Sequence, residues 1–161
     1  MKELRYIDAT QLGCGAVFCK DYDLIYAGTT IASMPESADD DTYMLLADKY
    51  DIRFIFDSNV TTVNFYALPR VDIFATDSNN GYWGTIGDAT DIENMSAQIC
   101  YVNNHNEIFI VADNLKNFIF PIDSINERRT KTMNKTDDVV LYSSKKDAEK
   151  AVKFIEIPKL E

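Results

Sequence analysis

The chain has 161 residues, of which 46% are hydrophobic and 12% aromatic, and its formal net charge at pH 7 is −10. This composition can supply a hydrophobic core, so it excludes a disordered chain and predicts a single domain over residues 1–161. The acidic balance disfavours nucleic acid as a partner, because a negative surface repels phosphate backbones.

The first 50 residues predict a hairpin followed by a short helix. Residues 15–19 and 23–27 are apolar segments on either side of a polar turn, which is the pattern of a hairpin. Residues 29–41 are polar and rich in turn residues, and they end in three consecutive acids. Acids stabilise the positive end of a helix, so we expect an amphipathic helix over residues 40–50 to begin there.

The remainder of the chain predicts a sheet with two further helices. The expected strands, marked by alternating apolar residues and by turn residues between them, are 52–56, 61–66, 71–75, 82–86, 98–102, 107–112 and 139–142. We expect one helix over residues 115–120 with Asp113 as its N-cap, and a final helix over residues 145–155 capped by Ser143 or Ser144. This balance predicts an α+β fold, a mainly antiparallel or mixed central sheet with helices packed to one side.

No catalytic residue, metal site or cofactor is expected. Cys14, Cys19 and Cys100 lack the spacing of zinc ligands, and we expect them to be free thiols in a reducing compartment. The single histidine, His105, lies in a predicted Asn-rich turn, and no nucleophile motif surrounds a serine or cysteine. No segment approaches the about 20 apolar residues that cross a bilayer, so we expect a cytoplasmic protein without a membrane partner.

Acidic and aromatic side chains in two segments predict a protein-binding surface. Carboxylates attract a basic partner over long distances, and aromatic rings supply contact area at an interface. The candidate partner-binding residues are Asp39, Asp40, Asp41, Asp77, Tyr82 and Trp83. Two plainer interpretations stay open: the acids only start a helix, and the segment around Gly81 is a tight turn followed by core aromatics. A third is a small-molecule-binding domain or enzyme that uses the Gly81–Gly87 turn and the acids near it.

The charge is unevenly distributed along the chain. Residues 1–125 hold 7 basic and 19 acidic side chains, a net charge of −12, whereas residues 126–161 hold 9 basic and 7 acidic, a net charge of +2. The acidic part could steer a basic partner toward the protein. The alternative is that acidic residues serve only solubility.

The segment from about residue 65 to 120 carries a family pattern. It combines an apolar strand ending in Phe74, a turn at Asn80-Gly81, an aromatic strand, an apolar strand with Cys100 and Tyr101, and a strand and helix that end the segment. This pattern resembles the SUKH superfamily, which includes fungal glucan-synthesis regulators and many bacterial immunity proteins. The resemblance implies an α+β domain that binds and neutralises a cognate toxin, often a nuclease, without catalysis. It implies no catalytic residues, and a basic toxin domain as the partner of an acidic surface.

Overall fold

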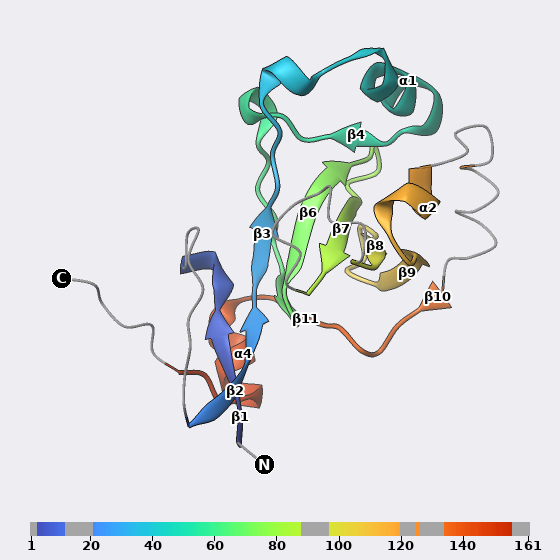
Figure 1. The fold of residues 1–161 in the computed structure, drawn as a ribbon. Helices are drawn as coiled ribbons and strands as arrows, with labels where there is room; N and C mark the ends of the chain where they lie inside the picture. Colours follow the sequence, from blue (N-terminus) through green and yellow to red (C-terminus); the bar gives the residue numbers. More distant parts are fainter. Residues whose placement is uncertain (1–2, 12–20, 88–96, 120–124, 126–133, 156–161) are drawn as a thin grey trace.

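A mixed sheet of seven strands forms the centre of the fold (Figure 1). The computed structural model describes residues 3–11, 21–87, 97–119, 125 and 134–155. The strands of the central sheet are β3 (Thr29–Ile31), β4 (Arg53–Phe54), β6 (Val71–Thr76), β7 (Tyr82–Ile86), β8 (Ile99–Val102), β9 (Ile108–Ala112) and β10 (Asn134–Lys135). Their order is β10-β9-β8-β7-β6-β3, and β4 pairs with β6 next to β3.

The four strands β6 to β9 form an antiparallel meander, and β3 makes the sheet mixed because it pairs parallel to β6. Strand β6 is apolar almost throughout because both of its faces are covered. Val71 and Ile73 pack in one core cluster, while Phe74 and Ala75 pack in the other. The pairing shifts between Ile73 and Ala75, and such a bulge changes which side chains share a face.

Two helices cover the same face of this sheet. Helix α1 (Asp41–Tyr50) and helix α2 (Leu115–Ile119) share one buried cluster, to which α1 contributes Leu46 and α2 contributes Phe118. Trp83 of β7 lies in the same cluster. The predicted α+β class is therefore confirmed.

Within the described ranges, every helix is too short or too polar to pass through a bilayer.

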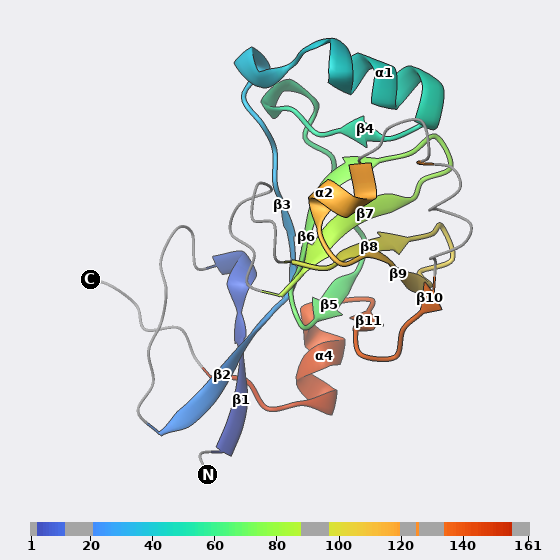
Figure 2. The same cartoon turned by 45° about the vertical axis from the view of Figure 1, so that its right-hand side comes forward.

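Two small ladders and a third helix lie at the end of the molecule away from α1 (Figure 2). Strand β1 (Glu3–Asp8) pairs in parallel with β2 (Tyr22–Ala27), and β5 (Tyr66–Leu68) pairs antiparallel with β11 (Val140–Tyr142). Helix α4 (Lys145–Ala151) packs its buried Ala148 against the cluster that contains Leu68. Short 3-10 helices are η1 (Ala9–Gln11), η2 (Glu36–Ala38) and η3 (Asp57–Asn59).

Several predicted strands are confirmed, and other regions differ. The strands predicted at 71–75, 82–86, 98–102 and 107–112 correspond to β6 through β9. In contrast, only β4 forms within 52–56, and the segment 61–66 is irregular until β5 begins at its last residue. Strands β1 and β3 were not predicted: β1 mixes charged and apolar residues, β3 has only three residues, and β3 forms by pairing with the distant strand β6. Residues 15–19 of the expected hairpin, with Cys14 and Cys19, lie outside the described residues.

The helix ends show where local sequence signals were sufficient. Asp40 caps α1 by accepting a hydrogen bond from the Thr42 N–H at 2.9 Å, and the helix begins where the acidic run predicted. The expected cap Asp113 is wrong, because the Asn114 side chain accepts from the Asn117 N–H at 2.8 Å instead. Ser144 caps the last helix as predicted.

That last helix is shorter than the predicted 145–155. It ends at Ala151, since the chain then extends and pairs with β1 through hydrogen bonds between Tyr6 and residues 153 and 155. Ala151, the last residue of this helix, is exposed.

Candidate binding groove

A groove of about 530 Å³ lies between α1, β4 and the turn that joins β6 to β7. We call it the α1 groove. Its lining residues are Asp39, Tyr43, Met44, Ala47, Arg53, Phe54, Ile55, Phe56, Asn59, Thr61, Thr76, Asp77, Asn80, Gly81 and Tyr82. The residues from Phe54 to Phe56 are buried, while most of the polar residues are at least partly exposed. The groove therefore has apolar residues in its interior and polar groups at its edge.

Helix α1 forms one wall through Tyr43, Met44 and Ala47. The Tyr43 ring packs edge-on against Phe54 and Phe56, with ring centroids 4.9 and 5.8 Å apart. Met44 is 57% exposed, although it borders an apolar interior. A flexible thioether at such a position can adapt to the surface of a bound molecule.

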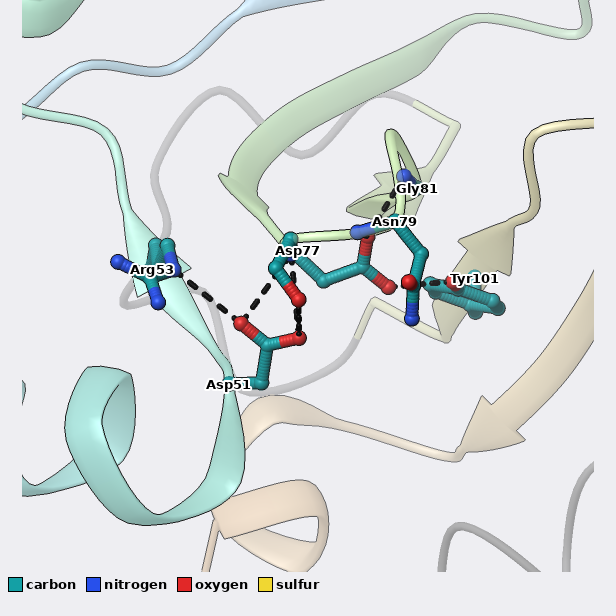
Figure 3. Close-up of polar contacts among 7 residues, drawn as sticks. Asp51, Arg53, Asp77, Asn79, Gly81 and Tyr101 are labelled. Atoms are coloured by element: carbon teal, nitrogen blue, oxygen red, sulfur yellow. Dashed lines mark hydrogen bonds and ion pairs between the residues drawn. The ribbon is translucent and has the colours of Figure 1, made fainter.

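The turn from Asp77 to Gly81 forms the opposite wall, and Asp77 holds its shape (Figure 3). One Asp77 oxygen accepts hydrogen bonds from the N–H groups of Asn79 and Gly81, at 2.9 and 2.7 Å. The other oxygen accepts from the Tyr101 hydroxyl at 2.5 Å. Asn80 adopts the left-handed conformation with φ of 62°. At Gly81 a Cβ atom would collide with the Tyr101 hydroxyl, so a larger residue at this position would displace the Tyr101 ring.

Asp51 links the end of α1 to this turn. It is the C-cap of α1, in the left-handed conformation, and both of its oxygens accept from the Ser78 N–H at 3.1 Å. The Ser78 hydroxyl donates at 2.6 Å and the Arg53 Nε at 3.1 Å. Burial opposes ionisation of Asp51, but the hydrogen bonds from Ser78 and Arg53 outweigh it and hold the pKa of Asp51 below its ordinary value. We call this contact the Asp51–Ser78 link.

The N–H groups of this turn are already used inside the protein. Those of Ser78, Asn79 and Gly81 all donate to Asp51 or Asp77. They therefore do not form the cluster of free amides that holds an anion. Gly84, within β7, is also needed for packing, since a Cβ there would lie 2.8 Å from the carbonyl oxygen of Asp72. These three N–H groups are therefore not available to a molecule bound in the groove.

Of the six candidate residues, the groove brings together Asp39, Asp77 and Tyr82. Asp39 is exposed, and its carboxylate has no hydrogen-bond or ionic partner among the described residues. Tyr82 is half-buried and its ring packs against Phe65 at 5.8 Å. Asp77 is buried and its oxygens are occupied by the turn. Asp39 and Tyr82 are therefore the members of this group that can contact a bound molecule.

The other three candidates do not line the groove. Asp40 is the helix cap, and Asp41 is exposed in the first turn of α1. The prediction that Trp83 offers its ring to a partner is wrong, because Trp83 is 0% exposed. Its ring packs against Tyr101 and Phe118, at 4.9 and 6.2 Å. Adjacent strand residues point to opposite faces, and the face of Trp83 is the one that the helices cover.

Sequence reasoning missed Met44, Arg53 and the other groove residues that follow the acidic run. A signal for Met44 was present. The buried face of α1 consists of Leu46 and Tyr50, which are four residues apart. Met44 and Leu45 are apolar as well, but they lie outside this buried face and are exposed. Leu45 is 42% exposed and does not line the groove.

Two further buried carboxylates hold the fold together outside the groove. Asp72 accepts from the Thr30 hydroxyl at 2.5 Å and lies 3.7 Å from Arg70, and its burial raises its pKa. Asp8 accepts from the Tyr66 hydroxyl at 3.0 Å and lies 3.4 Å from Lys145. Burial and the nearby Asp8 charge raise the pKa of Tyr66, which keeps its hydroxyl a donor.

Comparisons of the chain with protein-family models, with curated proteins and with solved structures found no match. The chemistry of the site therefore follows from its own residues. In the part of the chain that the structure describes, no group of three or more His, Cys, Asp or Glu side chains is placed to hold a metal ion. What the groove offers is an apolar interior, the exposed carboxylate of Asp39 and the guanidinium of Arg53.

Proposed function

We propose that this protein is a non-enzymatic binding module, and that its α1 groove docks a protein partner. The observation that carries the proposal is the exposed Met44 beside the exposed Asp39 carboxylate at the edge of an apolar groove. An apolar contact surrounded by polar groups is the usual composition of a protein interface. The proposal extends to an immunity protein of the SUKH kind, which would neutralise a toxin by covering its active site.

Charge around the groove favours a basic partner. Residues 36–59, which include α1 and β4, hold seven acidic and two basic side chains, a net charge of −5. This segment therefore carries half of the formal net charge of the chain, which is −10. Such a concentration accelerates the encounter with a positively charged surface, and salt weakens the effect. A nuclease toxin binds nucleic acid through basic residues, because they neutralise the phosphates, so it is a partner of the kind that this charge favours.

Matched variants of α1 test the docking site. Tagged protein would be used to capture partners from the native cell, and each partner would be quantified at low and high salt. Met44→Gln should reduce capture, whereas Leu45→Gln, a similar change on the same helix outside the groove, should not. Asp39→Asn should reduce capture at low salt, whereas Asp48→Asn should have little effect. Equal capture by all four variants would show that the groove is not the docking site.

A growth assay tests the more specific proposal of immunity. The protein would be co-expressed with the product of a toxin-like gene adjacent to its own, and growth would be compared for the wild type and Met44→Gln. Rescue by the wild type and loss of rescue by the variant are expected.

The proposal places the protein in the cytoplasm, where Cys100 would stay reduced. Burial raises the pKa of the Cys100 thiol to about 12, so this thiol is unreactive in any compartment.

A small molecule in the groove is the second candidate. The volume of the α1 groove, about 530 Å³, lies within the range of about 300–1,000 Å³ that is typical of ligand pockets. The side chains of Arg53, Asn59 and Asn80 would then provide specificity, since the turn amides are used internally. Screening a metabolite library by thermal shift tests this candidate. A ligand that stabilises the wild type but not Arg53→Gln would favour it over protein docking.

A further inference from the structure

The two exposed charged residues of the α1 groove, Asp39 and Arg53, lie at opposite ends of a helix. Asp39 immediately precedes the N-cap of α1, and Arg53 follows its C-cap by two residues. Helix α1 has ten residues, which corresponds to a length of about 15 Å. The ammonium and carboxylate groups of a free amino acid lie within about 4 Å of each other. The two ends of α1 are therefore much farther apart than the charged groups of a single amino acid.

The two ends differ in net charge. At the Asp39 end, the helix dipole is equivalent to a positive charge of about 0.5 elementary charge. The negative charges of Asp39, Asp40 and Asp41 outweigh it. This end therefore attracts a cation. Asp40 is occupied as the helix cap, whereas Asp39 has no partner among the described residues and lines the groove.

At the other end, the charge of Arg53 is already neutralised. Its Nε donates to Asp51 at 3.1 Å, and the C-terminal dipole of α1 adds a further negative contribution. The two terminal nitrogens of Arg53 have no partner among the described residues, and the side chain lines the groove. Without a net positive charge, these donors suit a neutral acceptor such as a peptide carbonyl better than a carboxylate.

We infer that the α1 groove holds an extended segment of the partner protein, of about four or five residues. The inference rests on the proposed function. A lysine or arginine of this segment pairs with Asp39, and an apolar side chain packs on Met44 and Phe54. A backbone carbonyl of the segment accepts from Arg53. The apolar interior between the two ends matches such a segment, because alternate side chains of an extended peptide point the same way.

Peptide selection tests the inference without requiring that the partner be identified. A phage-displayed library of random linear peptides would be panned against the wild type and against Asp39→Lys. The wild type should enrich peptides with a basic residue within about four positions of an apolar one. The variant should lose this basic residue or replace it with an acid. Asp48→Lys, the same change outside the groove, should select the wild-type pattern.

Binding of one selected peptide, measured by fluorescence anisotropy, tests each end separately. Asp39→Asn and Arg53→Gln should each weaken binding by about two- to fivefold, because both contacts are exposed to solvent. Lys49→Gln should leave binding unchanged. Replacing the basic residue of the peptide with Gln should remove the effect of Asp39→Asn but not that of Arg53→Gln.

The outcomes separate this inference from the proposed function. Enrichment of acidic peptides, or of peptides unaffected by Asp39→Lys, would overturn the inference. The same holds if no peptide is enriched while partner capture still depends on Met44, because the groove would then dock a folded surface. If neither peptide binding nor capture depends on groove residues, both the inference and the proposed function are wrong.

Discussion

The Asp51–Ser78 link joins α1 to the wall of the groove, and Asp51→Asn tests it. Asparagine has nearly the same shape as aspartate and also tolerates the left-handed conformation, which Asp51 adopts with φ of 57°. The substitution therefore keeps the backbone and removes the charge. The N–H and hydroxyl of Ser78 and the Nε of Arg53 would lose an ionised acceptor.

The expected loss of stability follows from these contacts. A hydrogen bond to a charged group contributes about 1.5–3 kcal/mol when it is buried. The Asp51 side chain is 32% exposed, and asparagine keeps one carbonyl oxygen as an acceptor. We therefore expect Asp51→Asn to lower the free energy of unfolding by about 1–2 kcal/mol at pH 7. For a protein of this size, each kcal/mol lowers the melting temperature by about 2–4 °C.

The pH dependence provides an independent check. The pKa of Asp51 is lowered in the folded protein, so its contribution is fully present above the unfolded pKa of about 3.9. It is lost as the pH falls through the lower folded pKa. Urea denaturation should therefore show a constant difference between wild type and variant from neutral pH down to about pH 5. That difference should shrink in more acidic solution.

A double-mutant cycle with Ser78→Ala completes the test. If the two residues act through their mutual contact, the double variant should be less destabilised than the sum of the single variants. The reasoning would be refuted if Asp51→Asn matched the wild type within about 0.3 kcal/mol at pH 7. A difference of the same size in strong acid would also refute it.

Three further predictions concern stability and can be measured by the same denaturation. Trp83→Ala should cost about 3–5 kcal/mol, because the side chain is completely buried, and an unchanged stability would contradict its place in the core. Gly81→Ala should cost about 1–3 kcal/mol through its collision with Tyr101, and a neutral effect would show that the ring moves aside freely. Asp8→Ala should cost about 1–3 kcal/mol because it leaves the buried Tyr66 hydroxyl without its acceptor. Lys145→Met should cost a similar amount, about 1–3 kcal/mol, because the buried Oδ2 of Asp8 loses its ionic partner and has no hydrogen-bond partner among the described residues; an unchanged stability in either variant would contradict these contacts.

Helix α1 shows what a local signal can determine. Three acids followed by a residue pattern of helical period predicted both the helix and its start, and Asp40 is indeed the cap. The antiparallel meander was predictable for a similar reason, since its strands are short, largely apolar segments bounded by turn residues. Asn106, in the turn between β8 and β9, has the left-handed conformation that such a turn requires. These features depend on residues that are close in sequence.

The groove itself could not be predicted in this way. Asp39 and Asp77 are far apart in the sequence, and they line one groove because β4 pairs with β6, with Phe54 opposite Ala75. Strand β3 escaped prediction because its pairing is long-range, and its Thr30 hydroxyl finds its acceptor on Asp72 of the distant strand β6. Pairings of this kind depend on the whole fold rather than on any local pattern.

The neighbours Tyr82 and Trp83 show which properties follow from the sequence and which follow from the tertiary structure. The sequence by itself determined that these rings lie on opposite faces of a strand, because side chains alternate along an extended backbone. Only the tertiary structure decided which face is covered. Helices α1 and α2 pack over the face of Trp83, so this ring is buried in the core, while Tyr82 remains half-buried beside the groove. The physical reason is that burial depends on what packs against a face, and this is set by elements distant in the chain.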